Sequence, residues 1–216
     1  MDMVELKRIS DEYDEAQKNW NLSSKRIFHE AFTEILSKKE ELEQKNNKEE
    51  LDELYEAFKK WIGEVGKAWN VKRSVPDECW EDFCLHLWKN LAAIKAGTYD
   101  FLENACEMTI KDEKTRKETK KHAYSYESKV CFVIAPEEYK LIYDSYNLEN
   151  MKIILDKWNS KKTSYAKLKE NAGSFKDYAK DCIEKYKSDI DSCLAKESPE
   201  YYFMADYLLW SGKAAR

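Results

Sequence analysis

Glycine and proline are scarce in this chain, which has only five Gly and three Pro among its 216 residues. Average usage would give about fifteen Gly and about eleven Pro. Tight hairpins and barrels depend on glycine-rich turns, so the deficit favours long helices. Charged residues make up 37% of the chain and aromatic residues 13%, a pairing typical of amphipathic helices around an aromatic core and unlike a disordered chain. We therefore predict an all-α fold, a multi-helix bundle with long helices.

Apolar residues recur at helical spacing along most of the chain. One stripe runs through Ser24–Leu42 and a second through Leu51–Trp69, with the polar segment Glu43–Glu50 as the turn between them. Both follow the i, i+3, i+4, i+7 rule and predict helices. Further helices are expected over Ser74–Ile94, Tyr99–Ile110, Pro136–Trp158, Thr163–Ala195 and Ser198–Trp210.

A polar segment divides the chain. Lys111–His122 has no apolar residue and six Lys or Arg against three acids, so it is expected to be exposed. We predict a single helical domain over residues 1–216, in which a basic loop (111–128) joins an N-terminal half (1–110) to a C-terminal half (129–216). The loop is either a spacer or a partner-binding surface. The candidate contact residues are Lys114, Arg116, Lys117, Lys120, Lys121, Tyr124 and Tyr126.

Several functional classes are disfavoured. The net charge of −5, with mixed signs, is unlike that of a nucleic-acid binder. No apolar run of about 18 residues is present, and the charged N-terminus is unlike a secretory signal. The chain is therefore expected to be cytosolic or a soluble piece of a longer protein. His29, His86 and His122 are scattered and no nucleotide-binding or metalloprotease motif occurs, so we assign no catalytic residue, cofactor or metal.

The six cysteines allow three interpretations: a metal site, a disulfide framework, or buried reduced thiols. Cys79 and Cys84, with His86 close behind, form the tightest group. In a helix this spacing places the two sulfurs roughly 140° apart, whereas zinc sites use closer pairs. Metal binding is therefore disfavoured, and reduced thiols in a cytosolic bundle remain an alternative. The even number suits a framework made of Cys79, Cys84, Cys106, Cys131, Cys182 and Cys193.

Helical geometry restricts how these cysteines could pair. Neither Cys79 with Cys84 nor Cys182 with Cys193 can form a bridge within an intact helix, since the second pair lies about 16 Å apart along the axis. Ten of the fifteen pairings of six cysteines remain. Each of them would join different helices.

Four segments occur in a recognisable order: NLSSKRIFHEAF, LHLWKNLAAI behind Cys84, CFVIAPEEYKLIYDSYNLENMKIILDKW from Cys131, and DYAKDCIEKYKSDIDSC. In that order they resemble four patterns of the Plasmodium interspersed repeat (PIR) family, including its vivax-type branch. These are an "LPS-x-x-x-aromatic" opening, a Cys-led "NL-x-x-L" helix, a cysteine before a "K-x-LYDYY-x-NY" helix, and "C-x-x-Y" with a further cysteine. The resemblance covers most of Asn21–Cys193 and rests on order and spacing. It departs at Ser23, where the family usually has Pro.

The resemblance implies a non-catalytic variant surface antigen that is displayed on, or exported into, the infected red cell. Its partners would be a host-cell surface protein and antibodies, with roles in cell adhesion and immune evasion, and it would bind no nucleic acid. The family's transmembrane segment is not part of this chain, which would be an ectodomain. Cys79 and Cys84 would then belong to two different disulfides, and the Asn21 sequon would matter only outside the cell. The alternative is an intracellular helical scaffold or interaction protein with reduced cysteines.

Overall fold

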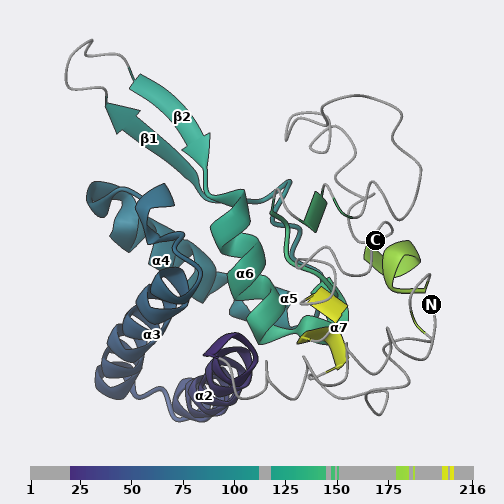
Figure 1. The fold of residues 1–216 in the computed structure, drawn as a ribbon. Helices are drawn as coiled ribbons and strands as arrows, with labels where there is room; N and C mark the ends of the chain where they lie inside the picture. Colours follow the sequence, from purple (N-terminus) through teal and green to yellow (C-terminus); the bar gives the residue numbers. More distant parts are fainter. Residues whose placement is uncertain are drawn as a thin grey trace. The chain divides into compact units, whose positions relative to one another are not determined.

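The computed structural model describes residues 20–111, 118–144, 147–148, 150, 179–184, 187, 201–203 and 205–206. The chain forms two compact units. We call Ile27–Ile134 the hairpin unit, and Met1–Arg26 with Ala135–Arg216 the terminal unit. The described residues are mainly helical with one two-stranded sheet (Figure 1), which confirms the predicted helical class in its coarser form.

The first two described helices follow the predicted stripes. Helix α2 spans Trp20–Gln44 and α3 spans Lys48–Ala68. Asn47 caps α3, because its side-chain oxygen accepts a hydrogen bond from the backbone N–H of Glu50 at 3.4 Å. Across the pair, Trp61 donates from its indole nitrogen to the carbonyl of Phe28 at 3.0 Å, which satisfies a polar atom that would otherwise be unpaired in the core.

The predicted continuous helix over Ser74–Ile94 is wrong, because four shorter helices occupy this stretch. Two 3₁₀ helices, η1 (Lys72–Ser74) and η2 (Asp77–Cys79), precede α4 (Trp80–Lys89) and α5 (Leu91–Lys95). Val75 is extended, as a residue before proline prefers. At Asn90 the side chain donates to the carbonyl of His86 at 2.8 Å, a local bond that competes with the helix and separates α4 from α5.

The predicted helix over Tyr99–Ile110 and the predicted loop over 111–128 are also corrected. Strand β1 (Glu107–Lys111) pairs antiparallel with β2 (Glu118–His122), and α6 follows at Tyr124–Ile134. The hairpin extends away from α3, α4 and α6 (Figure 1). Pairing with β1 gives the backbone N–H and C=O groups of β2 hydrogen-bond partners that a loop would lack. The strand therefore forms although all of its residues are polar.

Helix α6 lies in the core of the hairpin unit beside α3. Every residue from Tyr126 to Ile134 is buried. The hydroxyl of Tyr126 donates to the carbonyl of Ile62 on α3 at 2.7 Å. It reaches that carbonyl by crossing Gly66, where an added Cβ would lie within 3.0 Å of both the hydroxyl oxygen and Cζ of Tyr126. The missing side chain at Gly66 therefore allows α3 and α6 to pack this closely.

In the terminal unit the predicted continuous helix over Pro136–Trp158 is interrupted. Helix α7 covers Pro136–Tyr139, residues 141–144 are not helical, and residues 147–148 and 150 are helical again, while 151–158 lie outside the described residues. Of the predicted helix over Thr163–Ala195, residues 179–184 and 187 are described and helical, as are 201–203 and 205–206 of the last predicted helix. The remainder of both predictions lies outside the described residues. Every described helix is too short or too polar to span a bilayer.

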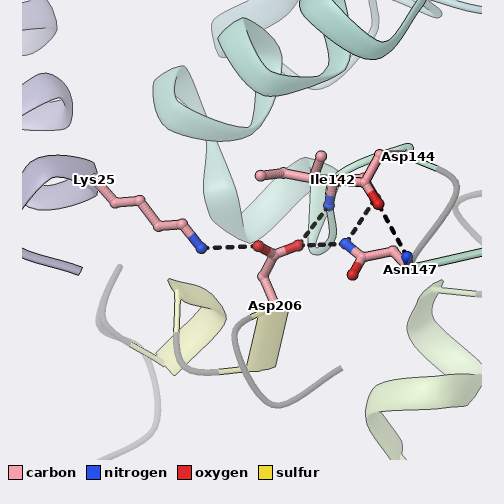
Figure 2. A network of polar contacts seen from close by, with 5 residues as sticks. All are labelled: Lys25, Ile142, Asp144, Asn147 and Asp206. Atoms are coloured by element: carbon pink, nitrogen blue, oxygen red, sulfur yellow. Dashed lines mark hydrogen bonds and ion pairs between the residues drawn. The ribbon is translucent and has the colours of Figure 1, made fainter. Parts of the chain in front are cut away.

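A buried carboxylate organises the described part of the terminal unit (Figure 2). Asp206, 3% exposed, accepts from the ammonium of Lys25 at 2.8 Å, from the backbone N–H of Ile142 at 2.9 Å, and from the side-chain amide of Asn147 at 2.7 Å. Asn147 also donates to the carbonyl of Ile142 at 2.9 Å. These bonds join segments that lie far apart in the sequence.

The expected disulfide staples are not supported by the structure. No disulfide joins the five described cysteines, which are all buried: Cys79, Cys84, Cys106, Cys131 and Cys182. Cys193 lies outside the described residues. Burial raises the pKa of Cys84 to about 12 and that of Cys106 to about 11. Such thiols stay protonated at neutral pH and react slowly with disulfides.

Candidate recognition hairpin

The hairpin β1–β2 is the candidate functional site, and its residue pattern explains its two unlike strands. In β1, Met108 is 2% exposed and attaches the strand to the hairpin unit. Strand β2 has no apolar residue, and residues 118–121 are all exposed. Across the sheet Met108 lies opposite Lys121 and Thr109 opposite Lys120. One strand therefore anchors the hairpin, while the other presents polar side chains to solvent.

The two lysines of β2 are in different electrostatic situations. The ammonium of Lys120 pairs with the carboxylate of Glu107 at 2.6 Å, diagonally across the strands. Lys121 has no ion-pair or hydrogen-bond partner among the described residues. Since an unpaired surface ammonium is available to an acidic partner, Lys121 is the more accessible of the two charges.

The base of the hairpin is fixed by a buried carboxylate on α6. Glu127 is fully buried, and its Oε1 accepts from the backbone N–H of Cys106 at 2.8 Å, immediately before β1. Its Oε2 accepts from the hydroxyl of Tyr99 at 2.7 Å. The entry to the hairpin is thus bonded directly to the core. A second contact is made by the thiol of Cys79, which donates to the carbonyl of Thr109 at 3.8 Å.

Tyr99 shares its single hydroxyl proton among several neighbours. Its oxygen lies 2.8 Å from Nε2 of His86 and 3.1 Å from the carbonyl oxygen of Asn104, besides Glu127. When Glu127 is ionised, Tyr99 donates to it, and an Nε2–H tautomer of His86 can donate to Tyr99. When Glu127 is protonated, it can donate to Tyr99, and the Tyr99 proton is then released for Asn104. The hydrogen bonds at the base of the hairpin therefore depend on whether Glu127 is protonated.

Burial sets the protonation behaviour of this cluster. It raises the pKa of Glu127 to about 7, and the hydrogen bonds from Tyr99 and Cys106 offset only part of that shift. Burial also lowers the pKa of His86. The pKa of Tyr99 is raised, first by burial and then by the charge of Glu127. Glu127 thus titrates near neutral pH, while His86 is mainly neutral there.

The structure places the contact residues predicted from the sequence in different environments. Lys120 and Lys121 are exposed on β2, whereas Tyr124 is half-buried at the start of α6 with its ring stacked on His122, the centroids 5.1 Å apart. Tyr126 is a correction, since it is fully buried and belongs to the core. The remaining candidates, Lys114, Arg116 and Lys117, lie outside the described residues.

Sequence reasoning missed the cluster of Glu127, Tyr99 and His86. The available signal was the single acid in the stretch 124–134. His86 was considered with Cys79 and Cys84, but its ring nitrogen contacts Tyr99 instead. In the described part of the chain, no three His, Cys, Asp or Glu side chains gather as a metal site would require.

Comparison of the chain with protein families, with curated proteins and with solved structures found no match.

Proposed function

We propose that the chain is a non-catalytic recognition domain, the ectodomain of a PIR-type variant surface antigen, which binds a host-cell surface protein through the hairpin β1–β2. The observation that carries the proposal is the contrast within the hairpin. Its base is bonded to the core through Glu127 and Cys106, while residues 118–121 of β2 are all exposed. A rigidly held polar element tolerates sequence variation at little cost in folding stability, as an antigen under antibody pressure requires.

The resemblance to the PIR family supplies the setting of this proposal. It implies a domain displayed on the infected erythrocyte or exported to the parasite surface, with antibodies as further partners. The basic side chains of β2 suit an acidic patch on a receptor. Electrostatic attraction of this kind speeds association and weakens as salt is added.

The test begins with an array of erythrocyte and endothelial receptor ectodomains, probed with the purified domain. The variant Lys120→Glu/Lys121→Glu should weaken binding to the receptor found there by at least tenfold and reduce its dependence on salt. Lys38→Glu/Lys45→Glu is the control with the same change in charge, because Lys38 on α2 and Lys45 just beyond its end are both exposed. Equal loss in both double variants, or no loss in the hairpin variant, would overturn the role of the hairpin.

A second candidate function is favoured by the cysteines. No disulfide joins the five described cysteines, as is usual in an intracellular helical scaffold or interaction protein. Intact mass of the natural protein under non-reducing conditions separates the two candidates. Each disulfide lowers the mass by two hydrogens, and six free thiols would favour the intracellular scaffold over the ectodomain.

A further inference from the structure

A pocket in the terminal unit combines positive charge with aromatic rings. Its volume is about 290 Å³, at the small end of the range for ligand pockets. Three lysines line it, together with Glu184, so the described lining carries an excess of two positive charges. Its apolar part is formed by Ile183 and the rings of Tyr201 and Tyr202. The lysines are Lys140, Lys180 and Lys187.

The buried Asp206, shown in Figure 2, joins the two segments of the chain that carry Lys140 and the tyrosines of this pocket. Asp206 follows Tyr201 and Tyr202 in the sequence, in the last described helical residues. It accepts the backbone N–H of Ile142, two residues beyond Lys140, at 2.9 Å. The tyrosine wall and the Lys140 wall are therefore bonded to each other through a buried carboxylate. A lining held in place in this way loses little conformational freedom when a ligand binds.

Lys140 lies at a strained point of the backbone. Its φ is 61° and its ψ is −46°, and the N–H of Leu141 donates to the carbonyl of Tyr139 at 2.6 Å across it. This is the rare, strained form of the γ-turn, an uncommon conformation for a residue with a side chain. The turn places the ammonium of Lys140 5.6 Å from the ring centroid of Tyr202. Backbone strain is thus accompanied by a positive charge held over an aromatic face of the pocket.

The three lysines differ in how their charge is compensated. Lys187 lies 3.2 Å and 3.3 Å from the two carboxylate oxygens of Glu184. Lys180 is exposed and has no ion-pair or hydrogen-bond partner among the described residues. Lys140 donates to the carbonyl of Glu137 at 2.8 Å, a neutral partner. Glu184 thus offsets the charge of Lys187, and the charge of Lys180 favours an anion.

We propose that this pocket binds a small aromatic oxyanion, an aryl phosphate or aryl sulfate. The lysines would bind the oxyanion, and the ring would pack against Ile183 and the tyrosines. Tyr201 and Tyr202 already meet edge to face, with centroids 5.3 Å apart, an arrangement that a further ring can extend. The proposal concerns the terminal unit and is independent of partner binding by the hairpin.

Titration calorimetry with phenyl phosphate tests the ligand class. Inorganic phosphate and phenol serve as comparators that carry only the anion or only the ring, and phenyl sulfate reports the effect of lower charge. Phenyl phosphate should bind saturably and at least tenfold more tightly than either comparator, with phenyl sulfate in between. Absence of saturable binding would overturn the site, and equal affinity for inorganic and phenyl phosphate would overturn the aromatic part.

Substitutions then locate the binding. Lys180→Gln and Lys187→Gln should each weaken phenyl phosphate binding about fivefold, as expected for loss of one partly solvated charge. Tyr202→Leu should weaken phenyl phosphate binding but leave inorganic phosphate unchanged. Lys67→Gln is the matched control, since Lys67 has the same i, i+3 pairing, with Glu64, in the hairpin unit. Affinity within twofold of wild type in Lys180→Gln/Lys187→Gln would overturn the proposal, whatever the hairpin variants do.

Discussion

Each unit contains a buried carboxylate that accepts a backbone N–H from a distant segment, but the two carboxylates are stabilised differently. Asp206 faces the ammonium of Lys25, itself almost fully buried. Glu127 has no cationic partner among the described residues and is bonded to Tyr99 and to the N–H of Cys106. Glu127 therefore relies on neutral donors and, with its pKa raised to about 7 by burial, exchanges a proton near neutrality.

A buried carboxylate can therefore hold a distant backbone segment either with a cationic partner or with neutral hydrogen-bond donors alone. A buried ion pair is costly to break, because the remaining charge stays in a poorly solvated place. A buried acid bonded only to neutral donors can instead become neutral when its charge is unfavourable. The hairpin base should therefore respond to pH, and the Asp206 cluster should respond most to the loss of Lys25.

The largest effect is expected from Lys25→Met, which removes the ammonium but keeps most of the side-chain volume. Urea unfolding should show a loss of about 3–5 kcal/mol, because Asp206 is left buried without its cation. Adding Asp206→Asn should recover part of this loss. A loss below about 1 kcal/mol would mean that water already compensates Asp206, and the contrast with Glu127 would fail.

The next largest effect concerns the packing of α6, the helix that carries Glu127, against α3. Gly66→Ala should destabilise the protein by about 1–3 kcal/mol, because the new Cβ collides with Tyr126 and displaces α6. Gly63→Ala is the matched control on the same helix, where a Cβ would lie 3.8 Å from the Trp80 ring. It should be neutral or stabilising by up to about 1 kcal/mol, through helix propensity. Similar unfolding midpoints for the two variants would contradict the close approach at Gly66.

A smaller effect is expected from pH. The pKa of Glu127 is about 7 in the folded protein, against 4.5 for an ordinary glutamate, so the folded chain binds more protons than the unfolded chain between these values. The free energy of unfolding should therefore fall as pH rises through 7, by about 1 kcal/mol between pH 6.5 and 8. The lowered pKa of His86 acts in the opposite sense, but only below its ordinary value of 6.5.

Glu127→Gln isolates this contribution, because glutamine can bond to the same neighbours without titrating. Urea unfolding at a series of pH values should show the fall between pH 6.5 and 8 in the wild type and a flatter profile in the variant. An unchanged profile would assign the pH dependence to other groups and would remove the distinction drawn between the two acids.

The smallest effect is expected at the exposed pair of Lys120 and Glu107. This pair has the same chemistry as Lys25 with Asp206, but its side chains are 69% and 47% exposed. Lys120→Gln should change the free energy of unfolding by less than about 1 kcal/mol, since solvent screens the charges. A loss as large as that of Lys25→Met would show that burial is not what separates strong pairs from weak ones here.

The sequence was sufficient to predict a helix where only one face of that helix is buried. The stripe over Leu51–Trp69 fits α3, because a one-sided helix has a regular apolar period. Helix α6 was missed for the opposite reason. Its residues are buried on every side, so its apolar positions follow no period, and length alone cannot separate such a run from a strand.

The hairpin was harder to predict from the sequence, because it is determined by pairing between strands and not by residue type. Strand β2 carries only polar side chains, and its structure depends on its partner β1, a non-local fact that a local pattern does not contain. The cluster at its base has the same origin. Tyr99 and Glu127 are separated by 28 residues and come together only when the chain is folded, so neither could be assigned a role beforehand.

The crossing of Tyr126 over Gly66 has a consequence for related sequences. Substitutions at the two positions are coupled, because a side chain at 66 and a tyrosine at 126 would occupy the same space. A lineage can replace the glycine only after, or together with, a shortening of residue 126, for example to leucine, which also gives up the hydrogen bond to Ile62. In related sequences, this pair is therefore expected to change together or not at all.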